Sequence, residues 1–88
     1  MGTKPEQTSP LRKSVHTAVR RYFKDMGSTQ PEDLHQLVLS EVEPPLIEEV
    51  LAQTGGNQST TAKILGITRN TLRTKLKRYK IRVNGNLR

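Results

Sequence analysis

The sequence predicts an all-α fold of four helices, in which an N-terminal helix pair forms a homodimer core and a C-terminal pair forms a helix-turn-helix. Two long segments carry apolar residues at spacings of three and four, which is the helical period. Proline, glycine and small polar residues stand at the ends of these segments, and we find no strand candidate. With 88 residues, the chain has room for one domain and a small core.

The first helix is expected over residues 10–26. Ser9 can cap it, and Pro10 suits its first position because a backbone N–H there would have no helical partner. Gly27 then ends the helix. The polar residues 1–9 are expected to form a flexible arm.

The second helix is expected to open with a capping box, in which Thr29 and Glu32 each satisfy a free backbone N–H, and to run to about Gln53. Pro44 and Pro45 lie in its middle, where a proline removes a helical hydrogen bond. Because the apolar period continues across both prolines, we predict one helix kinked at residues 44–45 rather than two helices.

Residues 57–80 match a helix-turn-helix. Asn57 can cap a short helix over about residues 58–65, and Gly66 stands at the turn, where a positive φ is easiest for glycine. Thr68 can cap a second helix that runs to residue 79 or 80. Residues 81–88 form a C-terminal tail that is expected to fray from Val83 onward.

Apolar residues lie on both sides of the predicted turn, and the small side chain of Ala62 lies where the two helices cross. On a helical wheel, at about 100° per residue, one side of the second helix is apolar and the opposite half is basic. An unfolded basic tail would show no such segregation. The predicted apolar anchors are Ile64, Leu65, Ile67, Leu72, Leu76 and Tyr79.

The positive charge of the chain is concentrated at its C-terminal end. Residues 1–49 hold six Lys or Arg and eight acids, a net charge of −2, whereas residues 50–88 hold nine Lys or Arg and no acid, a net charge of +9. The two halves sum to the +7 of the whole chain. A localised positive surface predicts a polyanionic partner, and an outward basic helix after a turn is the usual means of entering the DNA major groove.

The basic helix and its neighbour therefore supply candidate contacts to double-stranded DNA. Arg69 has the forked geometry that matches guanine O6 and N7, and short polar side chains beside it can reach base edges. Other cations and hydroxyls are expected to meet phosphates, as are residues at the start of the short helix, where free N–H groups point outward. The predicted base contacts are Thr68, Arg69, Asn70 and Thr74, and the predicted phosphate contacts are Asn57, Ser59, Thr71, Arg73, Lys75, Lys77 and Arg78.

The runs PLRKSV, RRYF, LVLSEVEPPLIEEVL and GGNQSTTAKILGITRNTLRTKLKRY together resemble the Fis family (factor for inversion stimulation) of bacterial nucleoid-associated DNA-bending proteins, over about residues 10–82. The resemblance implies that residues 10–54 interlock with a second copy and that two helix-turn-helix units enter adjacent major grooves. It further implies a bent duplex, a transcriptional role, a nucleoid location, and RNA polymerase or recombination proteins as further partners. The expected dimer interface is Leu11, Val15, Val19, Tyr22, Phe23, Leu37, Val38, Val42, Leu46 and Val50.

Thr60, Thr68 and Thr74 depart from the well-studied family member, which has arginine, asparagine and lysine at these positions. The resemblance therefore does not specify the phosphate contacts and base readout at these positions, or the preferred DNA sequence. Longer family members carry an N-terminal hairpin arm that activates DNA invertases. The short segment before residue 10 cannot supply that arm, so we do not expect invertase stimulation.

Composition also supports a dimer, because two amphipathic helices in a chain with 3% aromatic residues cannot easily bury their wide apolar faces within one subunit. The chain has no cysteine and no apolar stretch long enough for a membrane span. We therefore expect a cytoplasmic protein with no cofactor, no metal, no membrane partner and no small-molecule substrate.

Catalysis is poorly supported, since His16 and His35 are the only histidines and neither has a partner set nearby in sequence. Two other readings stay open. The first is the excised C-terminal DNA-binding domain of an enhancer-binding transcription activator. The second is an interaction module whose basic end binds an acidic protein or RNA, although RNA recognition usually needs aromatic stacking platforms.

Overall fold

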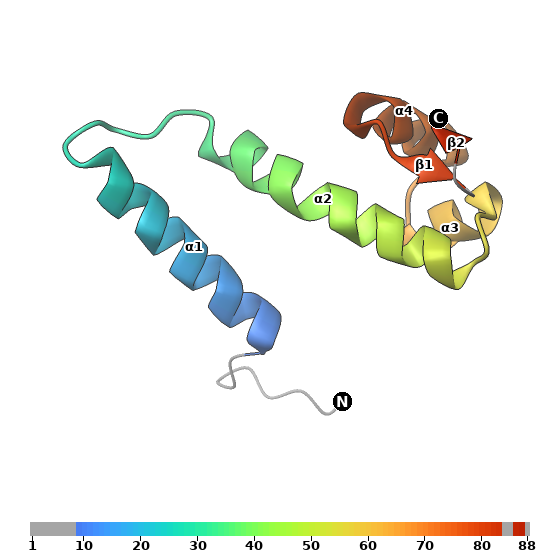
Figure 1. The fold of residues 1–88 in the computed structure, drawn as a ribbon, viewed down its shortest axis with the longest axis horizontal. Helices are drawn as coiled ribbons and strands as arrows, with labels where there is room; N and C mark the ends of the chain where they lie inside the picture. The colour runs from blue at the N-terminus through green and yellow to red at the C-terminus, as the bar shows by residue number, and fades with distance from the viewer. Residues whose placement is uncertain (1–8, 84–85, 88) are drawn as a thin grey trace. The chain divides into compact units, whose positions relative to one another are not determined.

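The computed structural model describes residues 9–83 and 86–87, which form four helices followed by a short hairpin (Figure 1). The elements are α1 (Pro10–Met26), α2 (Leu34–Gln53), α3 (Gln58–Leu65), α4 (Arg69–Tyr79), β1 (Arg82–Val83) and β2 (Asn86–Leu87). The chain divides into two compact units, one ending at Leu34 and the other beginning at His35. The all-α fold class is confirmed, with the hairpin as an addition. Apart from Ser9, the predicted flexible arm lies outside the described residues.

The first unit contains α1, which begins and ends where the sequence predicts. The Ser9 side chain accepts a hydrogen bond from the Arg12 backbone N–H at 3.1 Å, and Pro10 occupies the first turn. Gly27, at φ +64°, turns the chain out of the helix, and its N–H reaches the Phe23 and Lys24 carbonyl oxygens. No residue of α1 is buried.

The start of α2 differs from the sequence prediction. The helix begins at Leu34, so Thr29 and Glu32 lie outside it and the predicted capping box does not form. The residue before the helix, Asp33, has φ +54°, a left-handed conformation that helical residues do not adopt. This reversal of the backbone moves the first helical turn beyond Glu32.

One continuous helix spans both prolines, as predicted. Pro44 and Pro45 lie inside α2, which continues to Gln53. Because proline has no N–H, the carbonyl oxygens of Ser40 and Glu41 lack their usual helical donors. The bend expected at residues 44–45 stays a prediction.

The helix-turn-helix has the predicted caps. The Asn57 side chain accepts from the Thr60 N–H at 2.9 Å at the start of α3, and the Thr68 side chain accepts from the Thr71 N–H at 3.0 Å at the start of α4. Between the helices, Gly66 is left-handed at φ +78°, and the Ile67 N–H reaches the Ala62 carbonyl at 3.0 Å. This bonding pattern closes α3 and directs the chain into α4.

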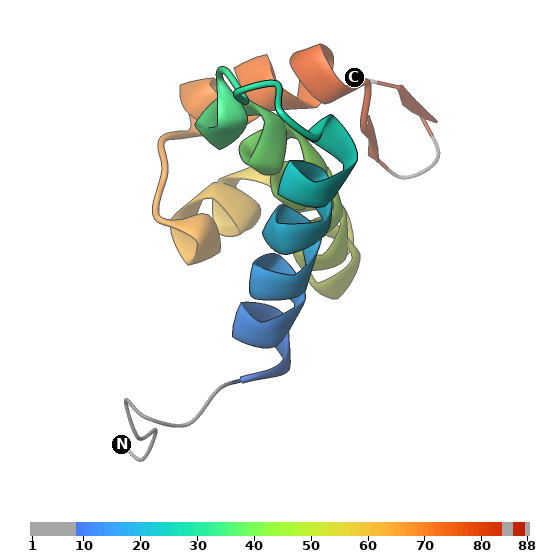
Figure 2. The ribbon, with the colours of Figure 1, turned by 90° about the vertical axis from the view of Figure 1, so that its left-hand side faces the viewer.

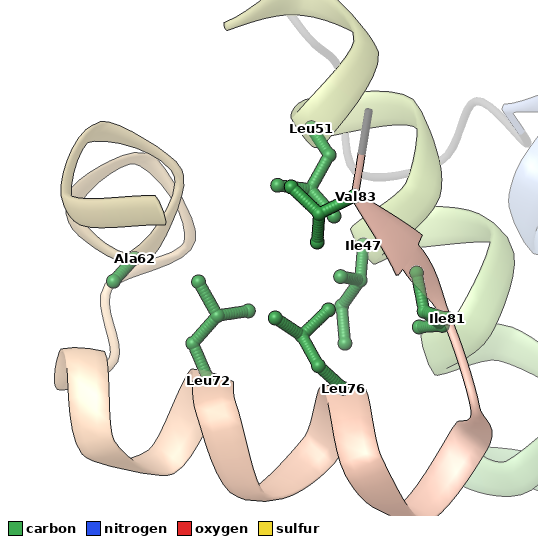
Figure 3. Close-up of a cluster of buried hydrophobic side chains, with 7 residues drawn as sticks. All are labelled: Ile47, Leu51, Ala62, Leu72, Leu76, Ile81 and Val83. Atoms are coloured by element: carbon green, nitrogen blue, oxygen red, sulfur yellow. The ribbon is translucent and has the colours of Figure 1, made fainter. Parts of the chain in front are cut away.

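A small apolar core lies where α2, α3, α4 and the hairpin meet (Figure 3). Leu72 and Leu76 point from α4 into this core, as predicted, and are 0% and 1% exposed. Tyr79 is only half-buried at the edge of this core. The prediction that Ile64 is an apolar anchor is wrong, because its side chain is 60% exposed on α3. The buried apolar residues are Ile47, Leu51, Ala62, Leu72, Leu76, Ile81 and Val83.

The C-terminal tail is the largest correction to the sequence prediction. Lys80 adopts a left-handed conformation at φ +54°, and the Ile81 N–H bonds to the Leu76 carbonyl at 3.0 Å. This turn at the end of α4 returns Ile81 and Val83 to the core, where they are 2% and 3% exposed (Figure 3). Residues 82–83 then pair with residues 86–87 as two antiparallel strands that follow α4 (Figure 2), so the predicted fraying is wrong at Val83, whereas residues 84, 85 and 88 lie outside the described residues.

One polar side chain is fully buried in this unit. Thr61, at 0% exposure, lies on α3, and its hydroxyl shares a hydrogen bond of 2.8 Å with the Thr54 hydroxyl at the end of α2. Thr54 also donates to the Leu51 carbonyl at 3.1 Å. The pair joins α2 to α3 and leaves the buried hydroxyl satisfied, which avoids the cost of an unpaired polar group.

Candidate nucleic-acid interface

The outer face of α4 carries the cations that the sequence assigns to DNA. Arg69, Arg73 and Lys77 follow one another at intervals of four residues, so they form one ridge along the helix, and all three are exposed. Arg78 is also exposed. Since Leu72 and Leu76 hold another face of α4 in the core, packing rather than charge alone leaves this basic ridge exposed to solvent.

The first turn of α4 presents short polar groups beside Arg69. The Thr68 hydroxyl accepts from the Thr71 N–H and donates to the Thr71 hydroxyl oxygen at 2.9 Å. Its proton is therefore used within the protein, while the Thr71 hydroxyl keeps a proton that it can donate outward. Asn70 is exposed in the same turn. A free N-terminal turn with hydroxyl and guanidinium donors is suited to phosphate oxygens and to acceptor atoms on base edges.

Thr74 lies one turn after Asn70 and is exposed. Its hydroxyl donates to the Asn70 carbonyl at 3.1 Å, so this proton is also used within α4. An outside partner would meet the methyl group or a hydroxyl lone pair. Both predicted base-contact threonines therefore offer acceptors and methyl groups rather than free donors.

The start of α3 contributes a second, smaller polar surface. Asn57 and Ser59 are exposed there, and the Asn57 side-chain oxygen (Oδ1) accepts the Thr60 N–H. Its side-chain NH₂ group remains as a donor for phosphate. Asn57, Ser59 and Thr60 lie at the helix terminus that favours anions.

Lys75 differs from the other predicted phosphate contacts. Its ammonium nitrogen lies 3.0 Å from Glu43 Oε1, and both side chains are about a fifth exposed, at 23% and 22%. The same carboxylate oxygen accepts a hydrogen bond from the Tyr79 hydroxyl at 2.7 Å. Lys75 is therefore held against α2, whereas the four other cations of α4 are directed to solvent.

These bonds change the titration of both acids. The hydrogen bond from Tyr79, followed by the bond and charge of Lys75, holds the pKa of Glu43 below its ordinary value, although partial burial opposes this. The pKa of Tyr79 is raised, mainly because its hydroxyl donates to the Glu43 carboxylate. The cluster therefore stays ionised at Glu43 and protonated at Tyr79 at neutral pH.

Each of the two units also exposes apolar side chains. On α1, Leu11, Val15 and Phe23 are 67%, 37% and 50% exposed. On α2, Leu37 and Leu46 are 38% and 48% exposed. The remaining predicted dimer residues are half-buried, namely Val19, Tyr22, Val38, Val42 and Val50.

Sequence reasoning missed Glu43, Thr61, Ile81 and Val83. Glu43 is one turn before the buried Ile47 on the same helical face, which was a readable signal, but its partners on α4 were not. The sequence around Asn84-Gly85 carries the dipeptide most typical of a tight hairpin, which could have identified the strands.

Neither a metal-binding group nor a membrane-spanning helix is found among the described residues. Residues 9–83 and 86–87 contain no group of three His, Cys, Asp or Glu side chains that could hold a metal ion. In the same part of the chain, no helix is both long and apolar enough to cross a bilayer. His16 and His35 are exposed on α1 and α2 respectively.

Residues 38–79 match the sequence model of a family described as bacterial regulatory protein, Fis family. The chain is 49% identical over 70 residues to proteins named DNA-binding protein Fis from Glaesserella parasuis serovar 5, Proteus mirabilis and Escherichia coli O1:K1 / APEC. Each alignment covers 80% of this chain and 71% of the relative. An alignment of that length extends well beyond the helix-turn-helix, so the similarity includes part of the first two helices.

Proposed function

Because this chain belongs to the Fis family of bacterial regulatory proteins, we propose that it is a homodimer that binds and bends double-stranded DNA through α4 to regulate transcription. The family consists of DNA-binding regulators, and the chain is not an enzyme. The observation that carries the proposal is the division of α4 into a buried apolar face, with Leu72 and Leu76, and an exposed basic ridge.

The proposed DNA contacts of α4 and of the start of α3 divide by chemistry. Arg69, Asn70 and the capping residue Thr68 face base edges, because the N-terminal residues of a recognition helix enter the groove most deeply. Arg73 and Lys77 follow along the ridge and meet phosphates. Asn57 and Ser59 at the start of α3 clamp the same backbone.

A second copy of the chain covers the apolar surface of α1 and α2. An amphipathic helix of 17 residues with no buried side chain would be marginal in water, since most helical stability in proteins comes from packing one apolar face. A symmetric pair would bury the exposed apolar side chains of each helix, such as Leu11 and Phe23 on α1 and Leu46 on α2, and would bring two α4 helices to one palindromic site. We extend the proposal to a nucleoid location, with RNA polymerase or recombination proteins as further partners.

Fluorescence anisotropy with labelled duplex DNA tests binding, and sedimentation tests the dimer. Arg73→Ala should weaken duplex binding by about threefold or more, because it removes a charge-assisted hydrogen bond. The matched control is Arg20→Ala, which removes an exposed arginine from α1 and should leave binding within about twofold. A circular-permutation gel assay then measures the bend.

Four results would contradict the proposal. An equal loss of duplex affinity in the Arg73 and Arg20 variants would show that α4 is not the DNA-binding surface. Binding to single strands or RNA alone would favour the interaction module. A protein that sediments as a monomer at micromolar concentration would contradict the proposed dimer. A bound duplex that migrates as a straight rod would contradict the proposed bend.

A further inference from the structure

One carboxylate joins α2 to α4 through directed bonds. Glu43 Oε1 accepts from Lys75 Nζ at 3.0 Å and from the Tyr79 hydroxyl at 2.7 Å, over sequence separations of 32 and 36 residues. Lys75 and Tyr79 are one turn apart on α4, so the two bonds grip adjacent turns of the helix. The cluster is about four-fifths buried at its ion pair, which limits screening by solvent.

These bonds lie where α2 is weakest. Pro44 and Pro45 follow Glu43 immediately, and each removes one hydrogen bond from the helix ladder. A helix that lacks two adjacent bonds bends more easily than its neighbouring turns. The bonds from α4 to Glu43 brace the helix at this point.

The apolar core between α2 and α4 cannot by itself fix the rotation and axial position of one helix on the other. Ile47 is one turn after Glu43 and packs in the same cluster as Leu72 and Leu76. Apolar contacts hold the helices together but are non-directional, so they tolerate small rotations and slides of one helix on another. Hydrogen bonds weaken steeply when their angle changes, so they specify one rotation and one axial position.

We propose that Glu43 is a positioning residue that fixes α4 on α2 and thereby sets the distance between the two reading helices of the dimer. This inference rests on the proposed function. In a symmetric dimer built on α1 and α2, any shift of α4 on α2 occurs in both protomers, so its effect on the separation of the two ridges is doubled. Glu43 therefore controls which half-site spacing the protein accepts and how far it bends the duplex.

The ion pair with Glu43 also limits the contacts that Lys75 can make with DNA. While Lys75 is paired with Glu43, its ammonium group is held against α2. It therefore interacts more weakly with a DNA phosphate than an unpaired lysine would. Removing the Glu43 carboxylate releases Lys75 to solvent, where it can contact a phosphate. The affinity of the protein for duplex DNA therefore need not fall. The expected signature is a loss of spacing selectivity with affinity maintained or raised.

The test compares Glu43→Gln with Glu41→Gln. Both substitutions remove one negative charge from α2, but Glu41 is exposed and two residues away from the cluster. The probe is a symmetric duplex selected from a random pool by the wild-type protein, together with versions whose central spacer is one base pair longer or shorter. Binding is measured by gel shift, and the bend by circular permutation, after thermal unfolding has shown that each variant is folded.

Glu43→Gln should reduce the preference for the selected spacer by about three- to tenfold, as expected when charge-assisted bonds are weakened but a neutral acceptor remains. It should also change the bend, whereas Glu41→Gln should match the wild type in both. Equal spacing profiles for the two variants would overturn the inference. If the wild-type protein itself fails to bind any duplex, the proposed function fails instead, which is a distinct result.

Two further variants keep the test decisive if Glu43→Gln does not fold. Tyr79→Phe removes one donor and keeps the ring, and Lys75→Met removes the other donor and keeps most of the stem. Each should relax spacing selectivity in the same direction as Glu43→Gln. Combining Tyr79→Phe with Glu43→Gln should change spacing selectivity by less than the sum of the two single effects, because both weaken the same hydrogen bond. Wild-type spacing profiles in both single variants would refute the positioning role.

Discussion

Replacing Ile81 with alanine measures what the segment that follows α4 contributes to the core. Ile81 is 2% exposed and packs with Leu76 and Val83, so the substitution removes three buried carbon atoms. At about 0.8 kcal/mol for each carbon the transfer term is about 2.4 kcal/mol. A residual cavity adds to this, so we expect the free energy of unfolding to fall by about 3 kcal/mol.

Thermal unfolding followed by circular dichroism is the assay. For a domain of this size each kcal/mol lowers the Tm by about 4–8 °C, so a fall of about 12–24 °C is expected. Wild type and variants must be compared at one protomer concentration, because the Tm of a dimer depends on concentration.

Ile64→Ala is the matched control. It makes the same chemical change at a side chain that is 60% exposed on α3, so it should alter the free energy of unfolding by less than about 0.5 kcal/mol. Equal Tm values for the Ile81 and Ile64 variants would refute the reasoning, since they would place Ile81 outside the cooperative core.

Three other substitutions follow from the interface. Arg69→Ala should cost about 1–3 kcal/mol in DNA binding and relax the preference at one base pair per half-site, whereas equal loss on every sequence would refute base readout. Lys77→Ala should weaken binding uniformly and flatten the plot of log affinity against log salt by about 0.9 for each phosphate that is no longer neutralised, so an unchanged slope in a salt titration would contradict a phosphate contact. Glu43 has a lowered folded pKa, so its stabilising effect is present above about pH 4.3 and is lost as the pH falls through the lower folded value. The stability difference between wild type and Glu43→Gln should therefore shrink on acidification, and a constant difference in denaturant titrations at neutral and acid pH would contradict the bonds from Tyr79 and Lys75.

Local chemistry explains why most of the helices could be predicted. Ser9, Asn57 and Thr68 cap the helices that follow them, and Gly27 and Gly66 have the positive φ that glycine adopts most easily. Each of these signals depends on neighbours within a few residues, so no knowledge of the tertiary fold was needed. The helical period then placed Leu72 and Leu76 inside and the basic ridge outside.

The start of α2 shows the limit of such local signals. Thr29 and Glu32 have the spacing of a capping box, but a capping box forms only if the backbone between them is helical. Asp33 adopts a left-handed conformation instead, and the helix begins after it. The side chains were compatible with two start points, and the backbone conformation selected the later one.

By itself the sequence determined the helical periods, the caps, the glycine turn and the concentration of positive charge on one helix, because all of these depend on residues near one another in the chain. The tertiary structure alone decided that Ile81 and Val83 complete the core and that Glu43 holds Lys75 and Tyr79. These contacts join residues more than thirty positions apart or depend on a chain reversal at Lys80. A burial pattern within one segment carries no information about which distant side chain completes a bond, and so the partner of a half-buried carboxylate appears only when the helices are packed.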